Sequence, residues 1–600
     1  MRSVRGLSQS SQIRMRFRQL NNAVVREYVF VALFLFGLAV VSLALYLPWL
    51  GLVGDDWWFF AHLSDGDFLS ILLREHPARP GVAIIWAGLW QFFGLRPWIY
   101  YLLSFACQWL TSLLVFVMLR VLFHWSTANA AVIAALFLMC PADTAHPYLS
   151  TLAIRISALL AMAGTVLWLY TQTRPVRPNW LFVLSLTLMA LSLLIYETPL
   201  FLLALLPFAQ AFVGWRGLRM WLRQALSCYS VLTVYFVFRL CMAFLVTQHS
   251  TRYYASLNLS PVWLLTQLSA VLNAVTWKGW LYALKAMIDF GLATSAVMLI
   301  GTMTVLLLIF VRLQRQGDNA PLDWRQSLKF IGVGLGLSVA GAVPVIVSRL
   351  SLENAIGTID GRLIHATALG YGLIAFGSCS LLSSLFIHQE WARNLLWSTT
   401  TSVLLALALI SNLSVQRDYA RSWQHQMSIL NDLHTYANSW QDGTAILLLE
   451  VPAGAFDIRF YYPFTEMARR FYADPTLHIL PWTIGFPPAQ QTLAFGTSET
   501  VVKTEIVQGD TRSFDYPRIA GFRVDANGDL MPTSDIGTQY FLLEAREASY
   551  LSLPASWQPA SASVQLDDPH TLVSAKESPD TEWRRWLLGQ LAFVEHYPTP

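Results

Sequence analysis

The sequence predicts an α-helical polytopic membrane protein with about eleven transmembrane helices and a C-terminal soluble domain of mixed α/β character. Hydrophobic residues make up 55% of the 600 residues and charged residues only 13%, against about 25% in soluble proteins. Apolar runs long enough to cross a bilayer recur up to residue 413, and the arginines gather in alternate connecting segments. The net charge of +4 is too small to indicate a nucleic-acid partner.

The N-terminal segment predicts the orientation of the chain. Residues 1–27 carry six arginines and a single acid, Glu27, and an apolar helix over Tyr28–Leu50 follows. This helix is too long for a signal-peptide core, and no small-residue cleavage site follows it, so we expect an uncleaved signal anchor. The positive-inside rule then places the basic N-terminus in the cytoplasm.

A short apolar run over Gly81–Phe93 decides the predicted topology. At about 1.5 Å per residue it spans about 20 Å, less than the hydrocarbon core of about 30 Å, so we expect it to lie in the outer interface. Counting it as a span would turn the basic cluster Arg216/Arg219/Arg223 to the outside, against the positive-inside rule. The later spans are then predicted at Pro97–Phe123, Asn129–Cys140, Thr151–Tyr170, Trp180–Ile195, Pro199–Val213, Ala225–Val246, Ala293–Val311, Phe330–Val347, Leu363–Phe386 and Leu395–Ile410.

An odd number of spans places the end of the chain outside the cytoplasm. The expected domains are a basic N-terminus over 1–27, a transmembrane domain over 28–413 whose first outer loop spans 51–96, and a soluble extracytoplasmic domain over 414–600. A second long outside loop is expected over His249–Leu284. The five cysteines all lie in apolar runs and none shows CxxC spacing, which indicates small core residues.

The C-terminal segment predicts a mixture of strands and helices. Asp525–Asp529 is typical of a hairpin turn. Helices are expected at Arg417–His434 and Phe464–Tyr472. Strands are expected at Ala445–Val451, Phe456–Tyr462, Leu477–Leu480, Thr500–Val507, Ile519–Val524 and Gln539–Glu544.

Candidate site residues converge on the outer face of this topology. Asp55 and Asp56 stand where the first span leaves the bilayer, a position where a carboxylate is costly without a partner or a task. Other ionisable residues open or end the neighbouring outer turns: Asp143, His146, Arg155, Glu197, Arg362 and, in the first outer loop, His76. A carboxylate there could take the proton of an attacking hydroxyl, and an arginine could hold a phosphate bidentately.

Structural alternatives to these roles stay open. Trp57 could stack on a sugar, yet Trp57–Phe60 is also typical of an interfacial aromatic belt. Arg362 could be a helix-end residue that reaches the interface. Asp143 and Glu197 could cap helices.

Three stretches of sequence carry a resemblance to a known family. They are Gly54-Asp55-Asp56 after the first helix, His76-Pro77-Ala78-Arg79-Pro80 before the short apolar run, and Asp360-Gly361-Arg362-Leu363 before a late span. This pattern resembles the GT-C superfamily of integral-membrane glycosyltransferases, and is similar to its protein O-mannosyltransferase-like and aminoarabinose-transferase-like members. In those members, too, the short apolar run is a juxtamembrane helix.

The resemblance implies an inverting transferase that uses a polyprenyl-phosphate sugar outside the cytoplasm, in the inner (plasma) membrane of a bacterium. It implies that Asp55 or Asp56 is the general base, with Asp55 slightly favoured, and that Asp143 is the second outer acid. Ala78 departs from the His-Pro-Pro pattern, so the donor sugar and the glycan, lipid or protein acceptor stay open. Some members need a divalent cation, for which Asp55, Asp56 and Asp143 offer oxygen ligands, but the sequence assigns no cofactor.

Two other functions remain open from the sequence. The first is a polytopic transporter or flippase for a lipid-linked or anionic substrate, with Arg239 and the outer acids as its charges. The sequence shows no repeated halves, which many transporters have. The second is a GT-C-like scaffold without activity that serves as an assembly partner.

Overall fold

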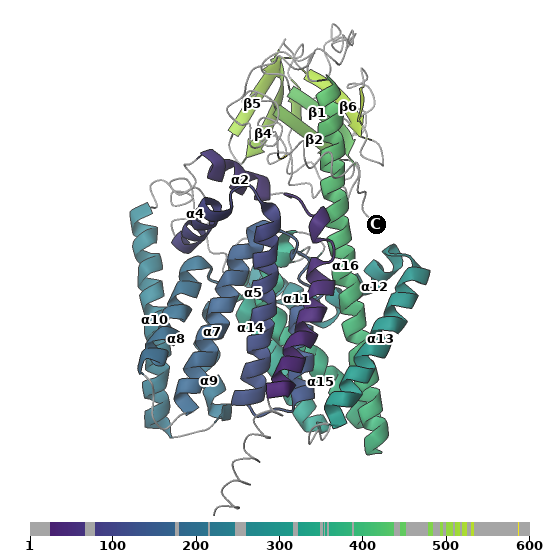
Figure 1. Ribbon diagram of the computed structural model, residues 1–600. Helices are drawn as coiled ribbons and strands as arrows, with labels where there is room; N and C mark the ends of the chain where they lie inside the picture. Colours follow the sequence, from purple (N-terminus) through teal and green to yellow (C-terminus); the bar gives the residue numbers. More distant parts are fainter. Residues whose placement is uncertain are drawn as a thin grey trace, which may run out of the picture.

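The computed structural model shows a bundle of helices with strands gathered at one of its ends, beyond α2 (Asp55–Asp65) and α4 (Pro80–Phe93) (Figure 1). The described residues are 25–53, 55–65, 79–173, 179–213, 217–246, 260–315, 322–347, 352, 355–356, 359–386, 389–436, 445–451, 478–483, 493–495, 500–507, 510–515, 519–524, 530–532 and 586. Every structural statement below refers to these residues.

The protein is an integral multi-pass membrane protein. Among the described residues, eight helices are long and apolar enough to cross a membrane: Val25–Trp49, Pro97–Leu122, Leu149–Gln172, Gln224–Met242, Leu292–Arg312, Trp324–Ile346, Gly361–Leu385 and Glu390–Ile429. Four shorter apolar helices accompany them: Pro80–Phe93, Thr127–Leu138, Asn179–Ile195 and Leu200–Ala209. The first of these is the predicted interfacial helix, and the other three fall on the shortest predicted spans. The total of about eleven spans stays a prediction.

The helices and turns occur in the following order along the chain. The first helix ends in a π-helical turn, η1 (Val40–Ala44), and a 3-10 turn, η2 (Leu47–Trp49). After α2 and α4 come α5 (Pro97–Val117), η3 (Met118–Leu122), α6 (Thr127–Leu138), η4 (Leu149–Thr151), α7 (Leu152–Thr173), α8 (Asn179–Ile195), α9 (Leu200–Val213), α10 (Leu218–Val246), α11 (Pro261–Asn273), η5 (Ala274–Lys278), α12 (Gly279–Asp289), α13 (Leu292–Arg315), α14 (Trp324–Ile346), η6 (Ile359–Thr367), α15 (Ala368–Phe386) and α16 (Glu390–Tyr436).

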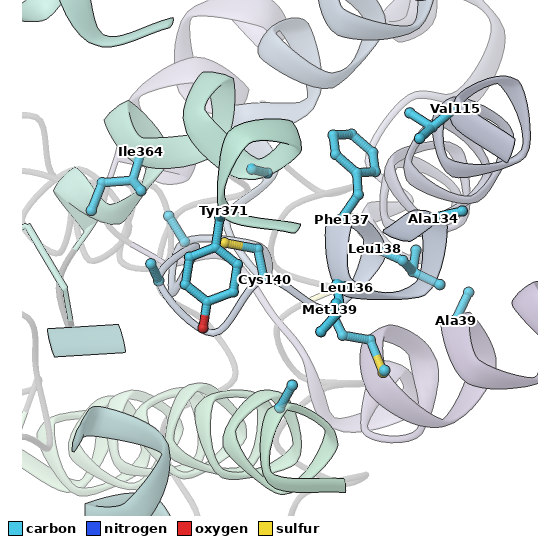
Figure 2. Close-up of a cluster of buried hydrophobic side chains, with 14 of the residues drawn as sticks. Ala39, Val115, Ala134, Leu136, Phe137, Leu138, Met139, Cys140, Ile364 and Tyr371 are labelled. Atoms are coloured by element: carbon cyan, nitrogen blue, oxygen red, sulfur yellow. The ribbon is translucent and has the colours of Figure 1, made fainter. Parts of the chain in front are cut away.

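The short helix α6 occupies the core. Its residues are apolar all round, and nearly all of them are buried, as expected for a helix enclosed by others. Cys140, just after α6, lies beside Tyr371 of α15, and both belong to the same buried cluster as Phe137 and Leu138 of α6 (Figure 2). The loop after α6, which carries Asp143 and His146, therefore begins at a position that is fixed by the buried core.

The predicted outside loop over His249–Leu284 is wrong for its described part, because residues 261–289 are helical without interruption. The side chain of Ser260 accepts a hydrogen bond from the Trp263 amide, and Pro261 takes the first helical position, which together start α11. Lys278 and Lys285 interrupt the apolar run of this segment, so its sequence does not predict a membrane-spanning helix. The segment packs inward, because Trp280 stacks on Tyr371 with ring centroids 5.3 Å apart.

The last predicted span and the helix predicted after it are one continuous helix. Helix α16 runs unbroken for 47 residues through the expected boundary at residues 413–414. Most of its residues between Ser411 and Gln426 are buried, including many polar ones, so the helix continues to pack after the apolar run predicted at Leu395–Ile410.

Apart from Trp586, the described residues beyond α16 form two sheets. One has the strand order β2-β1-β6-β7 and the other β3-β4-β5. In the first, β1 pairs in parallel with both β2 and β6, and Val524 of β6 lies opposite Leu530 of β7, as the predicted hairpin requires. The strands are β1 (Ala445–Val451), β2 (His478–Thr483), β3 (Leu493–Phe495), β4 (Thr500–Val507), β5 (Asp510–Asp515), β6 (Ile519–Val524) and β7 (Leu530–Pro532).

The predicted helix Phe464–Tyr472 and strands Phe456–Tyr462 and Gln539–Glu544 lie outside the described residues.

Candidate active site

The two adjacent acids of the first outer loop have different positions in the structure. Asp56 is fully buried, and its carboxylate accepts hydrogen bonds from the backbone amides of Val53 (3.3 Å), Leu149 (3.3 Å) and Ser150 (2.7 Å). Asp56 thereby fixes the first turn of α2 to η4, across 93 residues of sequence. Asp55 opens α2, and its side chain lies outside the described set.

The aromatic residues that follow the acids are packed inside the protein. Trp57 is 1% exposed, donates its indole Nε1–H to Gln426 Oε1 at 3.0 Å, and stacks on Trp423 with centroids 5.7 Å apart. Trp86 of α4 is fully buried and stacks on Tyr100 at 5.5 Å. In this conformation neither tryptophan offers a face to a sugar, and both hold the first outer loop against the bundle.

A second group of ionisable side chains gathers around Asp143. His365 Nδ1 lies 2.8 Å from Asp143 Oδ2, and Arg155 Nη2 lies 4.0 Å from the same oxygen. His146 Nδ1 lies 3.2 Å from the Asp143 backbone carbonyl. We call Asp143, His146, Arg155 and His365 the Asp143 cluster; all four residues are buried. Three separate segments supply them: the loop after α6, the first turn of α7, and η6.

The charges in this loop follow from burial and from the neighbouring cations. Burial alone would raise the pKa of Asp143, but the hydrogen bond and charge of His365, with the charge of Arg155, lower it to about 2. Burial lowers the pKa of His146 to about 4, although Asp143 opposes this shift. At neutral pH Asp143 is therefore a carboxylate and His146 is neutral. An acid held in its charged form is better suited to pairing with cations than to accepting a proton.

A close backbone approach brings Arg362 to this cluster. A Cβ atom added at Gly361 would lie 2.5 Å from Thr144 Oγ1, so η6 rests directly on the loop that carries Asp143. Arg362 follows that glycine and is half-buried, whereas Arg155 is only 3% exposed. The Nε atom of Arg155 has no hydrogen-bond partner among the described residues, so this donor could serve an anion.

Glu197, the acid between α8 and α9, forms a two-point ion pair with Arg79. Arg79 Nε donates to Glu197 Oε2 at 2.8 Å, and Arg79 Nη2 contacts Oε1. The guanidinium also lies 3.9 Å from the ring centroid of Tyr196. Burial would raise the pKa of Glu197, but Arg79, with a contribution from Arg239 of α10, lowers it to about 2. The pair joins α4, at the end of the first outer loop, to the turn after α8.

His365 is not among the site residues predicted from the sequence, and its contact with Asp143 is what identifies it. Of the other predicted site residues, His76 lies outside the described residues. Among the side chains that the structure describes, no group of three histidines, cysteines or acids could hold a metal ion. Because Asp55 is not among those side chains, the cation alternative stays a prediction.

Among known proteins, the chain is similar to solved structures. No protein-family model and no curated protein matches the chain. The chain is similar to the crystal structure of ArnT from Cupriavidus metallidurans bound to undecaprenyl phosphate, with 12% identity and a TM-score of 0.34, over 76% of this chain and 90% of that one. It is also similar to the apo state of ArnT, with 15% identity and a TM-score of 0.32, over 73% of this chain and 84% of that one. ArnT is a GT-C aminoarabinose transferase.

Proposed function

We propose that this protein transfers a sugar from a polyprenyl-phosphate-linked donor to an acceptor at the outer face of the membrane, with Asp55 as the general base. One observation carries the choice of base. Asp56 is buried and accepts three backbone amide hydrogen bonds, so its carboxylate is occupied as an anchor. Asp55, its neighbour on the first turn of α2, is then the acid left for chemistry.

The proposed step uses one proton transfer and one displacement. The Asp55 carboxylate accepts the proton of the acceptor hydroxyl while the hydroxyl oxygen attacks the anomeric carbon of the donor sugar. The bond from that carbon to the phosphate oxygen breaks, and polyprenyl phosphate leaves with the electron pair. Attack opposite the leaving group inverts the anomeric centre.

The cationic side of the site would hold the leaving phosphate. We assign this role to Arg362, which is half-buried, directly follows the Gly361 contact with Thr144, and has a planar guanidinium that suits two phosphate oxygens. Arg155 Nε, which has no hydrogen-bond partner among the described residues, is a second donor for the same anion. Asp143, His146 and Glu197, predicted as substrate-binding, also hold the loops around the site through the contacts described above.

The proposed topology places this site outside the cytoplasm. The eight long helices and the three short ones predicted to cross would give the eleven spans, with α4 in the outer interface. Helix α2, helix α4 and the sheets lie at the same end of the bundle, which supports a common outer location (Figure 1). In a bacterium this arrangement corresponds to the inner membrane, with the N-terminus cytoplasmic and the soluble α/β domain periplasmic or extracellular.

The donor class can be tested on the purified protein. Mass spectrometry of the lipid that copurifies should find a polyprenyl phosphate or its sugar conjugate; undecaprenyl phosphate, the lipid in the ArnT structure, is the first mass to seek. Release of polyprenyl phosphate from the conjugate should then be measured in membranes that supply the acceptor. Movement of the conjugate across the bilayer without release would support the transporter alternative instead.

The base can be tested with matched acid-to-amide variants. Asp55→Asn should lower the release rate by about 10²- to 10⁴-fold, the usual contribution of a general base, with an unchanged yield of folded protein. The control is Glu390→Gln, which changes an exposed acid at the first residue of α16 and should leave the release rate unchanged. Turnover of Asp55→Asn at the unmodified rate would contradict this assignment.

A further inference from the structure

Five side chains of α16 form one continuous face toward the site. They stand three or four residues apart, which is the spacing of one side of an α-helix: Asn412, Gln416, Tyr419, Trp423 and Gln426. We call them the α16 face. Four of the five are buried and Tyr419 is half-buried, although three of the side chains end in an amide.

The lower part of the face holds the end of the first membrane helix. Gln416 Nε2 donates to the Ser42 carbonyl at 2.6 Å, and Gln416 Oε1 accepts from the Tyr46 amide at 3.2 Å. These backbone groups lie in and just after the π-helical turn Val40–Ala44. A π turn shifts the regular hydrogen bonds of a helix, and the glutamine amide satisfies two backbone groups at that point.

The upper part of the face holds the loop that leads into α2. A Cβ atom added at Gly51 would fall within the Trp423 ring, so the backbone and the indole are in direct contact. Trp57 stacks on Trp423 and donates its indole hydrogen to Gln426. Trp586, from near the end of the chain, packs on both rings at 6.1 Å and 5.9 Å.

The same face also supports the loop of the Asp143 cluster. Tyr419 packs edge-on against Tyr148, with ring centroids 4.8 Å apart, and the His146 ring lies beside the backbone of Asn412. Tyr148 directly precedes Leu149 and Ser150, whose amides hold Asp56. The two acid-bearing loops therefore rest on one helix and are fastened to each other where they meet.

We propose that the α16 face sets the position of the general base relative to the phosphate-binding side of the site, and that Gln426 is a positioning residue for the transfer. This inference rests on the proposed function, because the base and the phosphate are those of that reaction. Gln426 is the outermost contact of the face and bonds the residue two positions after Asp55. Small displacements of a positioned group cost up to about 100-fold in rate, so the contact is expected to affect catalysis rather than binding.

The test separates positioning from folding. Gln426→Leu removes the acceptor for the Trp57 indole and should lower kcat for donor release by about 10- to 100-fold, with little change in the KM for the donor. Gln426→Glu keeps an oxygen acceptor and should restore most of the rate. Gln424→Leu, a half-exposed glutamine on the same helix, is the matched control and should behave like the unmodified protein.

Hydrogen exchange supplies a readout that does not depend on activity. In Gln426→Leu the amides of α2, together with those of Leu149 and Ser150, should exchange faster than in the unmodified protein, while α14 is unchanged. Two results would overturn the positioning role. One is a lower kcat in Gln426→Leu with hydrogen exchange as slow as in the unmodified protein, and the other is a change in KM without a change in kcat. If the unmodified protein transfers no sugar, the proposed function fails, and the exchange experiment then reports only on the packing of α16.

Discussion

His365 and Asp143 are 222 residues apart in the sequence, and their side chains meet at 2.8 Å in the interior of the protein. The contact joins η6, which carries Arg362, to the loop between α6 and η4. Because Arg155 stands 4.0 Å from the same carboxylate oxygen, one buried anion draws together side chains from two elements. The candidate site is thus organised around Asp143 as much as around the acids of the first outer loop.

Loss of this contact should destabilise the protein. His365→Ala leaves the Asp143 carboxylate buried with Arg155 as its remaining ion-pair partner, and an incompletely satisfied buried charge costs about 3 to 5 kcal/mol. We expect a lower thermal midpoint in detergent, measured against His124→Ala, whose exposed side chain lies outside the cluster. His365→Asn, which keeps a hydrogen-bond donor, should recover part of the loss; equal destabilisation by both variants would contradict a hydrogen-bonding role.

Stability should fall on acidification, in two stages. Burial lowers the pKa of His146 from its ordinary value of 6.5 to about 4 in the folded protein. The unfolded chain therefore binds more protons between these values, and stability decreases as pH falls through them. Asp143 and Glu197 have folded pKa values of about 2, below their ordinary values of 3.8 and 4.5. Their contribution is present above the ordinary values and is lost as pH falls toward 2.

Thermal midpoints between pH 8 and pH 3 would measure this profile. The first stage should disappear in His146→Gln, and the second should become shallower in Glu197→Gln. A stability maximum near pH 5 would contradict the sign of the His146 shift.

The ion pair between Arg79 and Glu197 should behave as a unit. Glu197→Gln or Arg79→Gln alone should lower the thermal midpoint, since each leaves a charge with fewer partners in a largely buried setting. The exchanged variant Arg79→Glu/Glu197→Arg should recover part of the loss if direct attraction is the main contribution. Additive losses in the double variant would indicate that each residue acts separately, for example Arg79 through its contact with the Tyr196 ring.

Long apolar runs and stretches rich in β-branched residues made much of the fold predictable from the sequence. The strands Ala445–Val451, Thr500–Val507 and Ile519–Val524 have the bounds expected from their β-branched and apolar content. The eight long apolar helices fall on predicted spans, because twenty or so apolar residues have few other stable arrangements. Helices α11 and α12 were missed, since Lys278 and Lys285 break the apolar run although packing keeps the helix continuous.

The site was predictable only in part, because its decisive contacts join distant segments. The predicted topology placed Asp143, Arg155 and Arg362 at one face of the membrane. It could not rank Asp55 against Asp56, since that depends on amide groups at Leu149 and Ser150. The glutamines of α16 carried no signal either: Gln416 and Gln426 look like surface residues until their backbone and indole partners are known.

The length of α16 has a pharmacological consequence. At about 1.5 Å per residue, its 47 residues extend about 70 Å, more than twice the hydrocarbon core of a bilayer. A large part of the helix therefore stands clear of the lipid, within reach of a macromolecule that never enters the bundle. An antibody fragment that binds the exposed side of this part of α16, which includes Asp418 and Arg421, and changes the tilt of the helix should inhibit the proposed sugar transfer without competing for donor or acceptor.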